Sequence, residues 1–144
     1  MFREKLKEIL VKEVMVSPVI TILDTDEFHV VQDKFATHGI RHLPVVEAHG
    51  VLMGLITQRS LYKIHSPRRL EDGSWYYDKD LLDGFILKNV MIKDPITLKA
   101  NSTLLEAIEA MNQFKLGSIP VVDDLRRPIG MITGGDVLKF FLVK

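Results

Sequence analysis

The residues with the clearest chemical potential lie near the C-terminus, where an apolar run passes into Thr133-Gly134-Gly135-Asp136 and then into an apolar, helix-like segment. Threonine offers a hydroxyl, the glycines allow a tight turn with bare N–H groups, and aspartate offers two acceptor oxygens. A helix N-terminus favours an anion, so this layout could hold a small ligand with a phosphate and a diol. The alternative is that Asp136 only caps a strand-to-helix turn.

The same stretch occurs twice in the chain. Gly54-Leu55-Ile56-Thr57 lies 76 residues before Gly130-Met131-Ile132-Thr133, and this offset holds without a gap from residue 14 to residue 62. Ten positions are identical in register, including Val14-Met15 with Val90-Met91 and Pro44-Val45-Val46 with Pro120-Val121-Val122. The chain is therefore a tandem repeat.

The order of these motifs resembles a known family. Val-Met, Pro-Ile-Thr, an amphipathic helix, Leu-Pro-Val-Val and Gly-x-Ile-Thr-x-x-Asp resemble a CBS domain, and two copies resemble a CBS pair (Bateman module). The resemblance implies an α/β (α+β) fold of two β-α-β-β-α repeats packed sheet to sheet with pseudo-two-fold symmetry. The expected organisation is an N-terminal amphipathic helix at residues 1–13, repeat 1 at 14–65, a linker at 66–88 and repeat 2 at 89–144.

Composition narrows the class of protein. The chain has 144 residues, 47% of them hydrophobic, which suits one compact unit. Nineteen basic residues balance nineteen acidic ones, so we expect neither nucleic acid nor an anionic membrane as a partner. Cysteine is absent, which excludes disulfides and thiolate sites. No apolar run approaches the ~20 residues of a membrane helix, and no signal peptide is evident, so we expect a cytoplasmic protein.

Periodicity and turn residues predict the elements of each copy. Copy 1 is expected to have strands at residues 19–22, 43–47 and 51–57, a helix from Asp26 to a C-terminal cap at Gly39, and a short helix from Ser60. Copy 2 is expected to have strands at residues 96–98, 121–122 and 129–132, and a helix from Ser102 with Thr103 and Glu106 at capping-box spacing.

Two segments have no counterpart in the other copy. Residues 2–13 predict an amphipathic helix, which either covers its own domain or docks on a partner. The linker carries Trp75-Tyr76-Tyr77 before a possible helical turn from Asp78 to Leu87. These aromatic residues either close a seam of the module or form a partner surface.

Catalysis finds little support in the sequence. His38 and His42 have a spacing that suggests a metal, but Gly39 and Pro44 argue against a continuous helix that would place both on one face. No nucleophile elbow, dinucleotide fingerprint or P-loop is present. We therefore expect no enzyme, no catalytic residue, no metal site and no catalytic cofactor.

The resemblance to CBS pairs implies a ligand site instead. In such pairs an adenosine derivative lies between the two copies, where the motif Thr and Asp hold phosphate and ribose and apolar residues hold adenine. Arg41 and His42 add cationic character, which favours a phosphorylated ligand. The alternative for these two residues is a strand-edge pair that meets water or an acidic neighbour. The implied ligand-binding residues are Thr133, Gly134, Gly135, Asp136, Val14, Ile40, Arg41, His42 and Pro44.

A second, pseudo-symmetric cleft is implied but departs from the family pattern. Ser60 replaces the ribose-binding Asp, and one hydroxyl cannot accept from two ribose hydroxyls as a carboxylate does. We therefore expect weaker binding there. Its residues are Thr57, Ser60, Val90, Leu116, Gly117, Ser118 and Pro120.

The sequence thus favours a regulatory module that binds AMP, ADP, ATP, S-adenosylmethionine or an NAD-like compound and signals by a change of conformation or assembly. The resemblance also implies a homodimer, and regulation would require a separate protein partner or a change in the chain's own assembly. The alternative function is a structural dimerisation module without a nucleotide.

Overall fold

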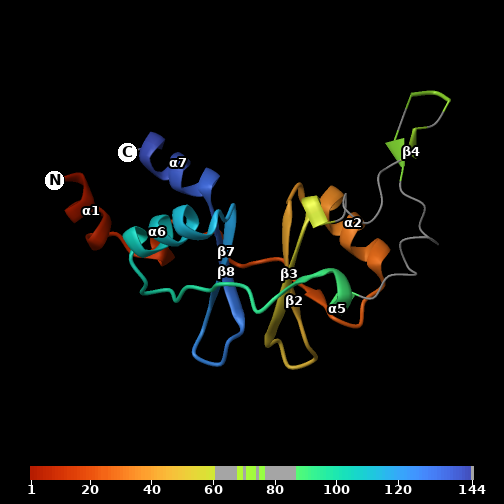
Figure 1. Cartoon of the computed structure of the whole chain (residues 1–144), viewed down its shortest axis with the longest axis horizontal. Coiled ribbons are helices and arrows are strands. Elements are labelled where there is room, and N and C mark those ends of the chain that lie inside the picture. Colours follow the sequence, from red (N-terminus) through yellow and green to blue (C-terminus); the bar gives the residue numbers. More distant parts are fainter. Residues whose placement is uncertain (61–67, 70, 74, 77–86, 144) are drawn as a thin grey trace. The chain divides into compact units, whose positions relative to one another are not determined.

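The computed structural model describes residues 1–60, 68–69, 71–73, 75–76 and 87–143. The chain forms two compact units, which we name by their place in the sequence. The terminal unit comprises Met1–Val19, Gly50–Leu52 and Pro95–Lys144, and the central unit comprises Ile20–His49 and Met53–Asp94 (Figure 1). Both chain ends therefore belong to one unit.

The terminal unit is a small sheet with helices packed on it. Its strands pair antiparallel, with Ile119 opposite Ile132. Its core joins Leu6 and Val11 of the N-terminal segment to Leu104, Ile119 and Ile132 of the second copy. The elements are α1 (Phe2–Glu8), the 3-10 turn η1 (Val11–Glu13), α6 (Leu104–Phe114), β7 (Ser118–Val122), β8 (Pro128–Thr133) and α7 (Gly134–Val143).

The central unit holds a four-stranded sheet in the order β1-β2-β3-β6. Phe28, Val31 and Phe35 lie on the buried side of its helix and pack with Leu43 and Ile56 of the strands. A separate two-stranded sheet joins β4 to β5. The elements are β1 (Ile22–Leu23), α2 (Phe28–His38), β2 (His42–Val46), β3 (Leu52–Thr57), β4 (Arg68–Arg69), β5 (Trp75–Tyr76), α5 (Leu87–Val90) and β6 (Ile92–Lys93).

The segment that opens each sequence copy pairs with the last strand of the other copy. In the central unit, Ile92 of β6 lies opposite Leu55 of β3. In the terminal unit, the equivalent residue Val16 forms an antiparallel bridge with Met131 of β8. Residues 14–19 therefore open the first copy in sequence but fold with the second.

We call this pairing of each opening segment with the other copy the exchange. Two glycines, one in each copy, leave room for it. A Cβ on Gly130 would lie 3.0 Å from the Val16 carbonyl oxygen and would also collide with the Met15 side chain. A Cβ on Gly54 would lie 2.8 Å from the Ile92 carbonyl oxygen and would collide with Met91. The Val-Met and Gly-x-Ile-Thr motifs thus occur together because the segment that carries the methionine crosses the strand at the glycine of Gly-x-Ile-Thr.

The predicted fold class, a mixed α/β (α+β) arrangement, is confirmed. The cap at Gly39 is also confirmed, since this residue has φ 61° and its N–H donates to the Phe35 carbonyl. Thr103 caps α6 by accepting from the Glu106 N–H at 3.2 Å. Asp26 and Ser102 instead bind the turn just before each helix, accepting from the N–H groups of Leu23 and Lys99.

Several expected elements differ in their bounds: the strand expected at residues 19–22 is the two-residue β1, and the strand expected at residues 121–122 is the longer β7. The strand predicted at residues 96–98 is wrong, because the chain makes only a bridge at Leu98 to Val121 before turning at Lys99. The N-terminal helix ends at Glu8, because Ile9 is extended and its carbonyl accepts from the Leu104 N–H at 2.7 Å. This helix lies against α6 and so covers the second copy.

Two expectations fall mainly on residues outside the described ranges. Residues 58–60 are helical, and the rest of the short helix expected from Ser60 is not described. The turn predicted from Asp78 lies outside too, apart from Leu87 in α5. Trp75–Tyr76 forms β5 opposite Arg68–Arg69, and Tyr77 is not described, so both alternatives for the aromatic residues stay open.

Candidate ligand-binding site

The start of α7 is a reciprocal capping box. The Thr133 N–H donates to Asp136 Oδ2 at 2.9 Å, and the Asp136 N–H donates to Thr133 Oγ1 at 3.1 Å. This geometry follows from an Asp three residues after the Thr that precedes the helix. Asp136 therefore does cap the helix, but Oδ1 accepts no hydrogen bond from the described residues. One carboxylate oxygen stays available to a ligand.

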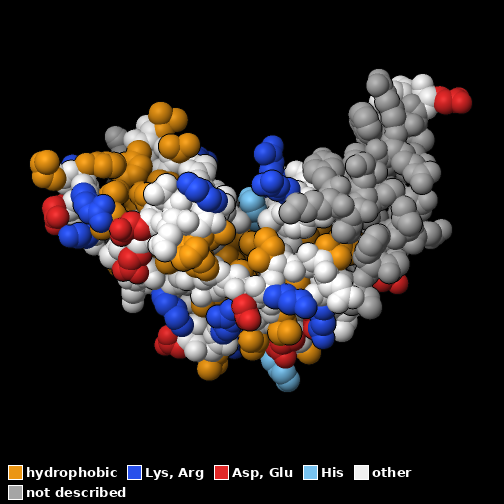
Figure 2. All heavy atoms as spheres, in the orientation of Figure 1, with side chains coloured by type: hydrophobic (Ala, Val, Ile, Leu, Met, Phe, Trp, Pro, Cys, Tyr) orange, Lys and Arg blue, Asp and Glu red, His pale blue; other side chains and the backbone are white. Residues whose placement is uncertain are grey.

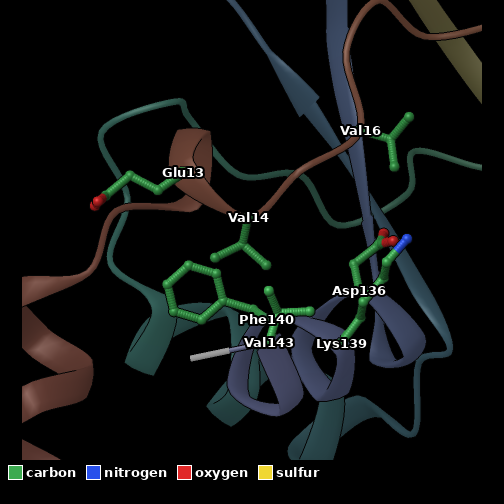
Figure 3. Close-up of a pocket in the computed structure, with 7 residues that line it drawn as sticks. All are labelled: Glu13, Val14, Val16, Asp136, Lys139, Phe140 and Val143. Atoms are coloured by element: carbon green, nitrogen blue, oxygen red, sulfur yellow. The ribbon is translucent and has the colours of Figure 1, made fainter.

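A pocket of about 270 Å³ lies beside this capping box, within the terminal unit. One wall comes from the segment around η1 and the other from α7, so the pocket joins the two ends of the chain (Figure 3). Its apolar residues are three valines and one phenylalanine, and its charged residues are two acids and one lysine. The lining residues are Glu13, Val14, Val16, Asp136, Lys139, Phe140 and Val143.

The charged groups of the pocket differ in orientation. Glu13 Oε2 accepts from the Leu10 N–H at 2.7 Å, and its side chain points away from Asp136 and Lys139 (Figure 3). Asp136 and Lys139 lie one helical turn apart and project from the same side of α7. Lys139 makes no ion pair within 4 Å with any residue that the structure describes. The pocket thus offers one carboxylate and one ammonium beside an apolar wall.

The predicted ligand residues divide between the two units. The terminal unit holds Thr133, Gly134, Gly135, Asp136 and Val14, of which Asp136 and Val14 line the pocket. The central unit holds Ile40, Arg41, His42 and Pro44. Ile40 packs on that unit's core, Pro44 is buried within β2, and the carbonyl of the exposed Arg41 accepts from the Gln58 N–H at 2.9 Å.

The residues predicted for the second cleft divide in the same way. Thr57, Ser60 and Val90 belong to the central unit. The hydroxyls of Thr57 and Ser60 bond to each other at 3.1 Å, and the Ser60 N–H donates to Thr57 Oγ1. The bond from the Ser60 N–H to Thr57 Oγ1 repeats one half of the capping box of α7, and the pair carries no carboxylate. Leu116, Gly117, Ser118 and Pro120 belong to the terminal unit.

Sequence reasoning missed five of the lining residues. Lys139, Phe140 and Val143 follow Asp136 by three, four and seven residues, a spacing that places them on one helix face. This spacing could have identified the three residues from the sequence, once Asp136 had been predicted as a ligand residue. Glu13 and Val16 had no such signal, because only the fold shows that their segment packs beside α7.

The fold and the pocket define a class: a duplicated α/β module with a small pocket of mixed polarity beside a helix start. The described residues contain no group of three His, Cys, Asp or Glu side chains that could hold a metal. In the same part of the chain, no helix has the length and apolarity needed to span a bilayer.

Comparison with known proteins identifies the family. A family model for the CBS domain matches residues 11–66 and 87–143, so the chain belongs to the CBS domain family and carries a tandem pair. A CBS domain-containing protein of Dictyostelium discoideum is 33% identical over 137 residues, which cover 94% of this chain and 92% of that protein.

Other relatives are much longer than the matched region. The L-aspartate semialdehyde sulfurtransferase of Methanocaldococcus jannaschii is 28% identical over 133 residues, covering 92% of this chain but 23% of the enzyme. The inosine-5′-monophosphate dehydrogenase of the same organism is 32% identical over 127 residues, covering 88% of this chain and 22% of the enzyme. This chain therefore spans less than a quarter of either enzyme.

A solved structure has the same fold. The CBS domain pair of protein MJ0100, in complex with 5′-methylthioadenosine and S-adenosyl-L-methionine, superposes with a TM-score of 0.76 at 25% identity. The match covers 93% of this chain and 96% of that one.

Proposed function

We propose that the chain is a regulatory module that binds an adenosine-containing small molecule in the pocket between η1 and α7. The observation that carries this proposal is the meeting of Asp136, with an unoccupied carboxylate oxygen, and an apolar wall of Val14 and Phe140 in one pocket. A ribose presents two hydroxyl donors and a base presents a flat apolar face, which match these two parts of the pocket.

Asp136 and three apolar lining residues have definite roles in this proposal. Asp136 Oδ1 accepts from the ribose hydroxyls while Oδ2 keeps its bond to the Thr133 N–H. The base lies against Val14, Val16 and Phe140. For Ile40, Arg41, His42 and Pro44 of the central unit, a role in ligand binding stays a prediction from the family resemblance. The complex of MJ0100 with two adenosine compounds supports this class of ligand.

The counterpart of this site in repeat 1 is proposed to bind a nucleoside more weakly. The Ser60 hydroxyl already bonds the Thr57 hydroxyl and brings no charge. A ribose diol is held best by an ionised acceptor with several free lone pairs. One tightly bound ligand per chain is the expected stoichiometry.

A thermal-shift panel of adenine compounds on wild type, Asp136→Asn and Asp136→Ala tests this function. A ligand at 100 times its Kd should add about 2.7 kcal/mol to the free energy of unfolding. For a chain of this size the melting temperature should rise by roughly 5–15 °C. Asparagine keeps an acceptor for the Thr133 N–H but loses the charge, so its ligand shift should fall while the apo melting temperature stays near that of wild type. Alanine should lower both.

A substitution in the central unit serves as the control for the Asp136 variants. Ser60→Ala removes only the hydroxyl that bonds to the Thr57 hydroxyl in the central unit, so the tightly bound ligand should still stabilise this variant. No stabilisation of the wild type by any adenine compound, in protein freed of carried-over ligand, would refute the proposed function.

A second candidate function is assembly into a homodimer, favoured by the outer face of α7. Leu138 and Leu142, one helical turn apart on this face, are 74% and 87% exposed, respectively. Figure 2 shows hydrophobic side chains gathered on the end of the terminal unit where α1 and α7 lie. Sedimentation of wild type and Leu142→Lys tests it: a dimer that becomes a monomer in the variant supports assembly through this face, and a monomeric wild type excludes it.

A further inference from the structure

The helix α1 depends on a few contacts with the rest of the terminal unit. It has seven residues, fewer than an isolated helix needs to be stable in water, so it forms only when it is packed. Its N-cap residue is Met1, which lacks the side-chain oxygen of a good cap. Leu6 is buried in the core, whereas the ion pair of Arg3 with Glu109 joins two exposed side chains and stabilises little. Docking of α1 is therefore sensitive to small changes in its contacts.

One end of α1 contacts the α7 wall of the pocket. The ring centroids of Phe2 and Phe141 lie 5.4 Å apart, and Phe141 lies edge-on to Phe140 at 5.5 Å. Phe140 lines the pocket, and Val14 points towards it from the opposite wall (Figure 3). A ligand that contacts Phe140 thus contacts a ring whose neighbour touches α1.

The other end of α1 leads into the opposite wall. Ile9 and Leu10 join α1 to η1, and the Leu10 N–H donates to Glu13 Oε2 at 2.7 Å. Glu13 and Val14 line the pocket on this side. The helix α1 therefore connects the two walls, because it touches α7 at Phe2 and continues into η1 at its C-terminal end. The separation of the walls determines whether both ends of α1 fit at once.

We propose that α1 is a strap whose docking is linked to occupancy of the pocket. This proposal rests on the proposed function and concerns the regulation of the same site. A ligand between Val14 and Phe140 contacts both walls and fixes their separation, which favours the form in which Phe2 lies against Phe141. In the empty pocket the walls separate more easily, so α1 undocks more often. The linkage is reciprocal: undocking of α1 weakens ligand binding by the same factor by which the ligand favours docking.

The strap carries information about the pocket to the outer surface. Phe2 is 63% exposed and lies at the end of the terminal unit where hydrophobic side chains gather (Figure 2). Undocking of α1 removes Phe2 from this end and uncovers the part of the core that Leu6 occupies. Occupancy of the pocket thus changes a surface that lies outside the pocket.

A matched pair of substitutions tests the strap. An aromatic pair changes an equilibrium constant by roughly 2- to 12-fold, and Phe2→Ala removes the pair with Phe141 while alanine favours the helix. Phe114→Ala is the control, because it removes a ring that is 50% exposed at the end of α6 in the same unit. Neither Phe2 nor Phe114 is among the described residues that line the pocket.

Isothermal titration and amide hydrogen exchange, both on the full chain with AMP and with 5′-methylthioadenosine, measure the two sides of the linkage. With a compound that binds, we expect exchange at residues 6–8 of α1 to slow about threefold or more, although these residues are not among those that line the pocket. The N–H groups of Leu125 and Arg127, which bond to Asp123, should change by less than about 1.5-fold. Phe2→Ala should weaken binding about threefold and remove most of the slowing, and Phe114→Ala should leave both as in the wild type.

The outcomes separate this inference from the function on which it rests. If neither compound binds the wild type, the proposed function and the strap both fall. If a compound binds but exchange at residues 6–8 stays the same, or Phe2→Ala binds it as tightly as the wild type, the strap is overturned while the adenosine-binding function stands. Equal weakening by Phe2→Ala and Phe114→Ala would show a general loss of stability, which also overturns the strap.

Discussion

At Gly130 the chain has no room for a side chain, and this gives a sharp prediction. A Cβ would lie 3.0 Å from the Val16 carbonyl oxygen and would press on Met15, whose segment crosses β8 at this point. Gly130→Ala should therefore destabilise the protein by about 1–3 kcal/mol, the usual cost of overpacking. Urea unfolding measures the change.

Gly135 provides the matched control for that substitution. A Cβ there would meet Thr133 Oγ1 at 3.6 Å, an ordinary contact, and Gly135 lies within α7. Gly135→Ala should stabilise the protein by about 0.5–1 kcal/mol, because alanine loses less backbone freedom on folding. Equal effects of the two substitutions would show that the crossing at Gly130 is not tight.

Asp123 gives a prediction about pH at the turn between β7 and β8. The Arg127 N–H donates to its Oδ1 at 2.9 Å, the Leu125 N–H does the same, and Arg127 Nε donates to Oδ2 at 3.0 Å. These bonds, with that of the Arg127 N–H foremost, hold the pKa of Asp123 below its usual 3.8. The folded state thus binds this proton less readily than the unfolded state.

The sign of the effect follows from the lowered pKa. The stabilisation from Asp123 is fully present above pH 3.8 and is lost as pH falls through the lower, folded value. The difference in unfolding free energy between wild type and Asp123→Asn should therefore shrink as pH falls through that range. Urea unfolding as a function of pH, with a carbon-detected NMR titration of Asp123, measures both quantities. A difference that is constant with pH would contradict this account.

At the scale of elements, the two copies end their first helices in the same backbone conformation with different residues. Gly39 follows α2 with φ 61°, and its counterpart Lys115 follows α6 with φ 56°. The left-handed conformation costs a residue with a Cβ roughly 1–2 kcal/mol and glycine almost nothing. Copy 2 therefore has a strained cap that copy 1 avoids.

Reciprocal substitutions test this difference. Lys115→Gly should stabilise the protein by about 0.5–1 kcal/mol after the greater flexibility of unfolded glycine is counted, and Gly39→Lys should destabilise it by a similar amount or more. A Cβ on Gly39 meets no atom within 4 Å, so the effect there is one of backbone conformation alone. Thermal unfolding of both variants and of the wild type measures these changes in stability. Effects of the same sign would refute the account.

The elements show where sequence reasoning succeeds. The cap at Gly39, the N-cap at Thr103 and the strand around Pro44 are local features, set by residues a few positions apart, and the sequence predicted them. Asp136 was also found from its neighbours, since a Thr and an Asp three residues apart form a capping box whatever the rest of the fold does.

The parts that the sequence did not predict depend on long-range packing. The exchange that places Val16 beside Met131 joins residues more than a hundred positions apart, and no local signal marks it. For the same reason Glu13 and Val16 were absent from the predicted site, although they line the pocket. The repeat offset locates equivalent residues but does not say which copy each segment joins.

At the scale of the whole molecule, the exchange means that neither repeat in sequence is a complete folding unit. Leu6, Val11 and Val14 are 5%, 0% and 9% exposed, and all three lie in the core formed with residues of the second copy. The Val11 N–H and the Ile9 carbonyl also bond to the backbone of Ser102 and Leu104 at 2.8 and 2.7 Å. The second copy thus depends on the first residues of the chain.

A fragment of residues 87–144 alone should therefore fail to fold, although it contains the whole second match to the CBS domain. It lacks the apolar side chains of residues 6–14 and leaves the Leu104 N–H without its bond to Ile9. Adding residues 1–19 as a peptide should restore cooperative folding, and Leu6→Ala in that peptide should weaken the rescue by about 2–5 kcal/mol, the usual cost of truncating a buried leucine. Circular dichroism and the dispersion of amide NMR signals report the outcome. If the fragment folds cooperatively without the peptide, the N-terminal segment only covers a core that is already stable, and the exchange is not required for folding.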